Sequence, residues 1–180
     1  MIYYTVPYDS NKNIGEYYNN FVDIVPNDND YICFIDADTI FTIPNYGHVI
    51  ESAIKSYPDV DCFTCYTNRV NCKWQVPDGC DISTDDYKYH RNFGEKLFEN
   101  YGSECIDMTK SQLFSGMFFI IKQSSWIKIG GAISKGMLGV DNNIHQKLIN
   151  NGMKLYLIKG LYVYHWHRGS CNNNNINHLI

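Results

Sequence analysis

The most constraining feature of the sequence is an apolar run that ends in two carboxylates. Tyr31–Ile35 holds aromatic, β-branched and cysteine residues, and Asp36-Ala37-Asp38 follows at once. An uninterrupted apolar run of this length is typical of a buried strand in a largely parallel sheet. Open α/β sheets bind ligands at the carboxyl ends of such strands. The pattern therefore predicts an α/β fold with a functional site directly after Ile35.

Asp36 and Asp38 are candidate ligands of a divalent cation. On an extended chain their side chains leave the same face, with Cα atoms about 7 Å apart, so that two negative charges converge. Oxygen ligands suit Mg²⁺ or Mn²⁺, which hold substrate diphosphates with one or two protein carboxylates. A solvated turn is the alternative, because Asp-x-Asp alone is a weak signal. The position of this motif after an apolar strand favours a metal site over a solvated turn.

Composition favours one globular domain. The chain has 180 residues, 44% hydrophobic and 15% aromatic, which is enough for a sizeable core. We expect a single domain over residues 1–170 and a polar, mobile tail over residues 171–180. The formal net charge is −4 and the sequence has no block of Lys and Arg. Nucleic acid is therefore not an expected partner.

The sequence carries no signal for membrane insertion or export. No window approaches the roughly 18 apolar residues of a transmembrane helix, and the first residues lack a basic flank and a cleavage site. Seven cysteines, an odd number, favour a reducing compartment over a disulfide framework. We therefore expect a soluble, cytoplasmic protein.

Four of the cysteines could in principle close a zinc site. Cys62 and Cys65 have C-x-x-C spacing, and Cys72 and Cys80 follow. The second pair is loosely spaced, and a strand over residues 60–66 would place Cys62 and Cys65 on opposite faces. Buried or incidental thiols are therefore favoured over zinc.

The segment before the carboxylates indicates a strand, a helix and a second strand. Residues 1–6 form the first strand, and residues 14–25 show helical apolar spacing. A right-handed βαβ unit places the carboxyl ends of both strands on one edge. The loop from Pro7 to Asn13 would then lie beside the carboxylates, where Tyr8 could stack on a base and Asp9 could accept a hydrogen bond from the base or a ribose. A plain turn is the alternative for Tyr8 and Asp9.

Three later positions carry polar or glycine residues at the ends of expected elements. Arg69 follows the strand over residues 60–67 and could clamp a phosphate or an acceptor group, with a surface arginine as the alternative. Ser115-Gly116 begins a strand, where glycine permits close approach of the backbone to a ligand. Asp141 lies near the start of a helix, either as a cap residue or as a functional carboxylate.

The last expected strand, residues 155–167, ends in two histidines. Alternation places His165 and His167 on one face and Trp166 on the other. A histidine at a strand end is more often structural than a ligand. Two on one face, followed by Arg168 in a chain with Asp-x-Asp, favour a binding role.

Five motifs in order resemble those of a family 2 glycosyltransferase with the GT-A fold. They are Asn13-Ile-Gly15-Glu-Tyr-Tyr-Asn19, Ile35-Asp36-Ala-Asp38-Thr, Ser115-Gly116 with Trp126 and Gly130-Gly131, Gly139-Val-Asp141, and Tyr164-His165-Trp-His167-Arg168. The match spans most of the chain, and five ordered motifs are far more specific than one. The resemblance implies a mixed, mostly parallel central sheet flanked by helices.

The resemblance also implies residue roles. Asp36 and Asp38 would bind Mn²⁺ or Mg²⁺ and the donor diphosphate, Asp141 would be the general base of an inverting enzyme, and His165 would complete the metal shell, with His167 as the alternative. The residues expected to contact the nucleotide sugar are Pro7, Tyr8, Asp9, Asn13, Gly15, Asp36, Ala37, Asp38, Ser115, Gly116, His167 and Arg168.

One departure concerns the nucleotide base. The family usually has a further βαβ step, with an acidic residue that reads the base, between the first strand and the Asn-x-Gly helix, and this chain lacks it. Base recognition therefore falls on residues 7–13, and a preference for uridine is an analogy. The expected function is transfer of a sugar, with inversion, from a UDP-linked donor to the hydroxyl of an unidentified glycan, lipid-linked or protein acceptor.

Two other classes of function remain open. Phe34–Thr39 also resembles the nucleophile motif of haloacid-dehalogenase phosphatases. That family carries the motif on its first strand and needs a later lysine and acidic pair, whereas here a strand and a helix come first and no such pair is evident. The other class is a catalytically idle module that binds a nucleotide sugar or a glycan.

Overall fold

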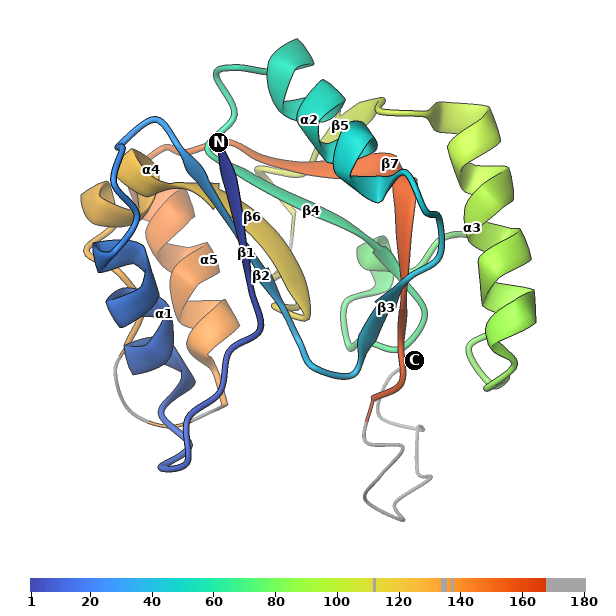
Figure 1. Ribbon diagram of the computed structural model, residues 1–180, viewed down its shortest axis with the longest axis horizontal. Coiled ribbons are helices and arrows are strands. Elements are labelled where there is room, and N and C mark those ends of the chain that lie inside the picture. Colours follow the sequence, from blue (N-terminus) through green and yellow to red (C-terminus); the bar gives the residue numbers. More distant parts are fainter. Residues whose placement is uncertain (112, 134–135, 137, 168–180) are drawn as a thin grey trace.

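The computed structural model describes residues 1–111, 113–133, 136 and 138–167. They form a seven-stranded mixed sheet with helices on both faces (Figure 1). The strands are β1 (Ile2–Thr5), β2 (Tyr31–Ile35), β3 (Thr39–Phe41), β4 (Cys62–Thr67), β5 (Cys105–Asp107), β6 (Phe118–Lys122) and β7 (Leu155–His165). The helices are α1 (Ile14–Asp23), α2 (Tyr46–Ser56), α3 (Tyr87–Tyr101), α4 (Gln123–Lys128) and α5 (Val140–Asn150), with a 3-10 turn, η1, at Lys73–Gln75.

Strand β2 is buried on both faces, as its apolar sequence predicts. Cys33 and Ile35 face the core under α2, while Ile32 and Phe34 face the core under α1, α4 and α5. In Figure 1 these three helices lie together on one side of the sheet and α2 on the other. Two helical layers thus leave β2 no solvent-facing side, which explains why its sequence does not alternate.

The strand order is β1-β2-β6-β4-β7-β3, with β5 paired to β7. Strands β1, β2, β4 and β7 run in one direction, and β3, β5 and β6 run in the other. Two of the six described pairings are parallel and four are antiparallel: β6 lies between β2 and β4 and pairs antiparallel with both, and β3 and β5 pair antiparallel with β7. The expectation of a mostly parallel sheet is therefore met by strand direction and is wrong for the pairings.

The βαβ unit at the start of the chain is confirmed. β1 and β2 pair in parallel across α1, with Ile2 opposite Tyr31 and Thr5 opposite Phe34. The two cysteines of the C-x-x-C pair also lie as expected, since Cys62 belongs to the core under α5 and Cys65 to the core under α2. No helix in the described ranges is long and apolar enough to cross a membrane.

The topology brings several chain segments to one edge of the sheet. The carboxyl ends of β2, β4 and β7 share this edge because the three strands run in the same direction. Strand β6 is antiparallel to β2 and therefore begins there, two residues after Gly116. This edge is consequently where the polar residues at the strand ends meet.

Candidate metal centre and adjoining cavity

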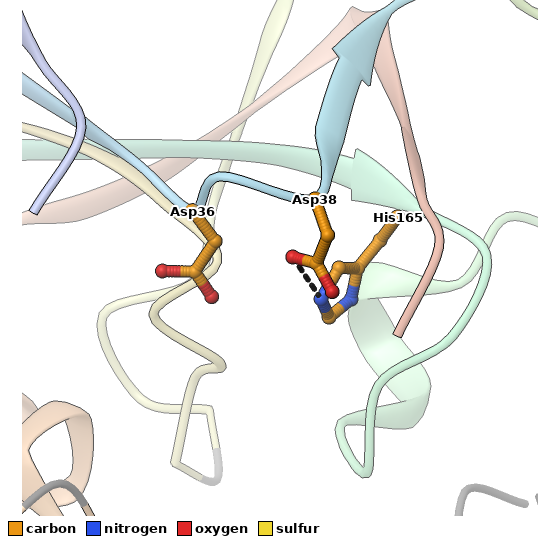
Figure 2. Close-up of side chains that lie close together, drawn as sticks. All are labelled: Asp36, Asp38 and His165. Atoms are coloured by element: carbon orange, nitrogen blue, oxygen red, sulfur yellow. Dashed lines mark ion pairs between the residues drawn. The ribbon is translucent and has the colours of Figure 1, made fainter. Parts of the chain in front are cut away.

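A turn after β2 positions the two carboxylates. The amide of Asp36 donates to the carbonyl of Met117 at 2.9 Å, and the amide of Thr39 donates back to the carbonyl of Asp36 at 3.1 Å. The chain thus bends through Asp36–Asp38 before β3 begins. The expected extended geometry, with the carboxylates projecting from a strand, is wrong, because β2 ends at Ile35. The turn nevertheless leaves both carboxylates on one side of the chain (Figure 2).

His165 faces these carboxylates from the last residue of β7. Its Nε2 lies 3.3 Å from Oδ1 of Asp38, the pair joined by a dashed line in Figure 2. One ligand atom each from Asp36, Asp38 and His165 lies within 4.8 Å of the others, so these three residues could hold a metal ion. The three come from the ends of β2 and β7 and from the turn before β3, so the site forms only when segments far apart in the sequence come together.

The orientation of His165 is fixed from behind by the end of β4. The backbone amide of His165 donates to Oδ1 of Asn68 at 2.8 Å, and its ring Nδ1 lies 2.9 Å from the carbonyl of Arg69. A carbonyl oxygen can only accept, so Nδ1 carries the proton. In the neutral ring Nε2 then presents a lone pair to a carboxylate oxygen. A proton or a cation must therefore lie between Nε2 and Asp38 for the contact to be favourable.

Arg69 is buried and serves the structure. Its guanidinium donates to the carbonyls of Ile82 and Thr84 and to Oδ1 of Asp85. The alternatives expected from sequence, a clamp for a phosphate or an acceptor group and a surface arginine, are both wrong, since the side chain is 6% exposed and its donors point into the protein. Its contribution to the site is the carbonyl that holds His165.

Asp36 lies in an environment that penalises its charge. The pKa of this carboxyl is raised to about 6, mainly by burial; His165 lowers it, and the nearby carboxylates of Asp38 and Asp141 contribute to the rise. Three carboxylates converging at one partly buried point repel one another. The cluster therefore has the negative potential that a divalent cation would neutralise.

Asp141 approaches the cluster from the start of α5. Gly139, with φ of 81°, holds the N-cap position, so Asp141 lies in the first turn and the cap role expected as an alternative is wrong. Its Oδ2 accepts from the amide of Gly116 at 3.2 Å. A Cβ added to Gly116 would lie 2.9 Å from that of Asp141, so only glycine permits this close approach.

A cavity of about 580 Å³ joins these groups. It is lined by Pro7, Ile14, Tyr18, Asp36, Ala37, Asp38, Ser115, Gly116, Met117, Leu138, Gly139, Val140, Asp141 and Trp166. The structure thus brings together Pro7, both aspartates with Ala37, Ser115-Gly116 and Asp141, which the sequence analysis selected separately. Its volume suits one drug-sized ligand.

Trp166 belongs to this wall, whereas His165 is not among the lining residues. This agrees with strand alternation, which assigns the two residues to opposite faces. β7 ends at His165, two residues before the expected end, and the amide of Trp166 donates to the carbonyl of Asp38 at 2.9 Å. Trp166 is 47% exposed, so its ring is available to a ligand.

Other residues expected to touch the donor lie away from the cavity wall. Tyr8 is 77% exposed, and Asp9 accepts from the amides of Asn11 and Asn13, which closes its own loop. Tyr8 and Asp9 therefore belong to a plain turn, which was the alternative expected from the sequence.

Asn13 and Gly15 make contacts within the protein instead. Oδ1 of Asn13 accepts from the amide of Gly136 at 3.1 Å. A Cβ on Gly15 would collide with the backbone carbonyl of Ile133, so this glycine allows α1 to approach residues 131–133. The Asn-x-Gly motif therefore joins α1 to the segment between α4 and α5, which borders the cavity.

The second histidine lies outside the three-residue group. His167 follows the end of β7 with φ of 36°, in the left-handed region, and its ring centroid lies 5.2 Å from that of His165. Arg168 lies outside the described residues. Of the two histidines, the geometry places His165 among the candidate ligands.

A scan against protein-family models found no matching family, and a search among curated proteins found no significant match.

Proposed function

We propose that this chain is a metal-dependent glycosyltransferase of the GT-A type, which uses a nucleotide sugar as donor. The observation that carries the proposal is the meeting of Asp36, Asp38 and Asp141 around one cavity of about 580 Å³, with His165 beside Asp38 as a third candidate metal ligand. The sequence resemblance supplies the family, and the shared cavity supports it because residues from distant motifs line the same space. Uridine as the base rests on the resemblance alone.

The donor set fits a divalent cation. Two carboxylates and one imidazole, whose Nδ1 is held by the carbonyl of Arg69, are ligands that Mn²⁺ accepts, and Mg²⁺ prefers the oxygens. A cation bound there would neutralise the donor diphosphate and stabilise the charge that develops on it as it leaves C1 of the sugar. Asp36, Asp38 and His165 hold their positions through backbone contacts at three strand ends, so the set is preorganised.

Asp141 is the proposed general base. Its Oδ1 accepts from the amide of Asn142 and its Oδ2 from the amide of Gly116, so the carboxylate is fixed beside the cavity. In an inverting transfer, the acceptor hydroxyl attacks C1 while Asp141 takes its proton, and the bond between C1 and the diphosphate oxygen breaks. Trp166, which also lines the cavity, offers an aromatic face to the sugar or the base.

A thermal-shift panel of nucleotide sugars, with and without manganese, tests this function. A donor at about 100 times its Kd adds about 2.7 kcal/mol to the stability of the folded state. We expect at least one UDP-sugar to raise the melting temperature in manganese and to release UDP when acceptors are added. No shift by any nucleotide sugar would contradict the proposal, and saturable binding without hydrolysis or transfer would favour the idle binding module.

A further inference from the structure

Three consecutive residues before β6 contact two of the carboxylates at the cavity. Residues 115–117 precede β6, and all three line the cavity of about 580 Å³. The amide of Gly116 donates to Oδ2 of Asp141 at 3.2 Å, and the carbonyl of Met117 accepts from the amide of Asp36 at 2.9 Å. The position of this segment therefore sets where Asp141 lies relative to Asp36.

Gln75 holds the first residue of this segment. Its Oε1 accepts from the amide of Ser115 at 2.6 Å, and its Nε2 donates to the carbonyl of the same residue at 3.3 Å. A backbone amide can only donate and a carbonyl can only accept, so these two partners fix the orientation of the side-chain amide. Gln75 thus pairs with Ser115 as a neighbouring antiparallel strand would, before the ladder between β2 and β6 begins at Phe118.

Gln75 is itself anchored in the core. It lies in η1, is 0% exposed, and its Nε2 also donates to Oγ1 of Thr64 on β4 at 2.9 Å. The Thr64 hydroxyl in turn donates to the carbonyl of Phe118, the first residue of β6. The thiol of Cys72 adds a second contact, since it donates to the carbonyl of Leu113 at 3.0 Å. The turn that carries Gln75 therefore holds the chain before β6 at two alternate residues.

We infer that Gln75 is the positioning residue for Asp141. The inference rests on the proposed function for the role of Asp141 as the general base. Gln75 fixes the backbone of Ser115, and this sets the direction of the next amide, which holds the carboxylate. A general base must lie within hydrogen-bond reach of the acceptor hydroxyl, and a displacement of about 1 Å can cost about 100-fold in rate. Gln75 should therefore affect turnover, although it is not among the residues that line the cavity.

Gln123 provides a matched control. It is also buried, at 6% exposed, and its Nε2 donates to the carbonyls of Val22 and Val25 near the end of α1. Both glutamines thus pair with backbone groups, but of the two only Gln75 pairs with the segment that contacts Asp141. Methionine has a similar length and volume, so Gln→Met at either position removes the hydrogen bonds and retains the packing. Both variants should lower the melting temperature, and only Gln75→Met should disturb Asp141.

The contact between Gly116 and Asp141 can be observed by NMR without any substrate. Ser115-Gly116 is the only Ser-Gly pair in the sequence, so ¹³C in the serine carbonyl together with ¹⁵N in glycine isolates one amide signal. Asp141→Asn replaces a charged acceptor with a neutral one, which weakens the hydrogen bond and should move the Gly116 proton signal upfield. We expect this shift in the wild-type and Gln123→Met backgrounds, and less than half of it in the Gln75→Met background.

An equal shift in the Gln75→Met background would overturn the inference. Gln75→Asn is a second variant for the case that Gln75→Met does not fold. Asparagine is shorter by one methylene group, so its amide no longer spans from η1 to Ser115, while the residue stays polar. We expect the same reduced shift in this background, and a full shift would overturn the inference as well.

Transfer rates test whether this positioning serves catalysis. Gln75→Met should lower kcat about tenfold to a hundredfold, while the KM for the donor changes by less than about twofold. In the Asp141→Asn background, Gln75→Met should lower kcat by less than about twofold, because a residue that acts through Asp141 then has no base to position. Equal losses of kcat in both backgrounds would show a general structural effect and overturn the inference.

The inference and the proposed function fail separately in these experiments. A reduced Gly116 shift in the Gln75→Met background, together with no sugar transfer by the wild type, would contradict the proposed function and leave the positioning of Asp141 in place. Sugar transfer by the wild type, together with a full Gly116 shift in the Gln75→Met background, would support the proposed function and overturn the inference.

Discussion

Two buried histidines at neighbouring positions of the fold have opposite surroundings. His90, on α3, is fully buried, with Nε2 3.0 Å from the carbonyl of Thr84 and Nδ1 2.7 Å from the hydroxyl of Tyr162. One partner accepts and the other can donate, so the neutral ring is satisfied on both sides. His165 instead lies between the carbonyl of Arg69 and the carboxylate of Asp38, which are both acceptors.

This difference separates a structural network from a candidate site. The His90 network, defined here as His90, Tyr162, Thr84 and Cys80, closes within the protein, and the sulfur of Cys80 lies 3.4 Å from the Tyr162 hydroxyl. The carboxylate cluster, defined as Asp36, Asp38 and His165, closes only when a proton or a cation is added. Both groups include a residue of β7, so burial alone does not identify a binding histidine. A binding histidine is identified by the atom that faces its second ring nitrogen, which in the case of His165 can only accept.

The largest expected effect belongs to Asp141→Asn. The amide keeps the shape of the side chain but cannot take a proton, so turnover should fall by about 10²- to 10⁴-fold. UDP affinity in manganese should stay the same, because the carboxylate cluster is intact. Steady-state transfer rates would measure the turnover, and calorimetric titration of the same preparation would measure the UDP affinity. Unchanged turnover in the variant would show that Asp141 is not the general base.

The second largest effect is expected for manganese binding, in which His165 and His167 should differ. His165→Ala removes a candidate ligand and should weaken manganese binding at least tenfold without nucleotide, a loss on the scale seen when a metal shell is disturbed. His167→Ala should weaken manganese binding less and affect the diphosphate more. Manganese affinity can be measured by electron paramagnetic resonance of the free ion. A larger loss in His167→Ala would reverse the assignment.

Tyr162→Phe should affect stability and leave binding intact. The substitution removes the hydroxyl that pairs with His90 and Cys80, which leaves buried polar atoms unpaired and should lower the free energy of unfolding by about 1–3 kcal/mol. UDP affinity in manganese, measured on the folded protein, should be unchanged. Urea unfolding provides the first measurement. Lost UDP affinity with intact stability would show that the two regions are not separate.

The smallest effect concerns Asp36 and pH. Its raised pKa, about 6, means that the folded protein retains a proton which the unfolded chain releases near pH 4. In chelator, stability from this group is therefore present below pH 4 and is lost as pH rises to about 6. Asp36→Asn lacks this loss and should be more stable than the wild type at pH 7.5.

Urea unfolding at pH 4 and pH 7.5 checks the Asp36 prediction. The exposed Asp59 provides the control variant Asp59→Asn, which should follow the wild type at both values. An Asp36→Asn variant that is less stable than the wild type at pH 7.5 in chelator would contradict this prediction. It would show that the ionised carboxylate of Asp36 does not destabilise the metal-free protein.

Sequence patterns predicted the parts of this site that depend on local order. The apolar run before Asp36, the βαβ unit and the helix that begins near Asp141 all follow from periodicity and from residue types at element ends. The sequence also pointed to His165, because it ends a strand in a chain with Asp-x-Asp.

The parts that depend on long-range pairing did not follow from the sequence. Nothing local indicates that β6 inserts between β2 and β4, and this insertion is what brings Gly116 within hydrogen-bond distance of Asp141. The burial of Arg69 depends on residues 82–85, which contact it across the fold. The last strand ends at His165 and not at His167, and this end depends on pairing with β3, whose register joins Thr39 to His165.

The most direct test of the central claim is the affinity for UDP in manganese and in chelator, measured by calorimetry on the wild type and on Asp38→Ala. If the carboxylate cluster holds a cation that binds the diphosphate, manganese should strengthen UDP binding in the wild type by at least tenfold, a difference of about 1.4 kcal/mol. Asp38→Ala should fold normally and lose this enhancement. Equal UDP affinity in manganese and in chelator for the wild type would contradict the account.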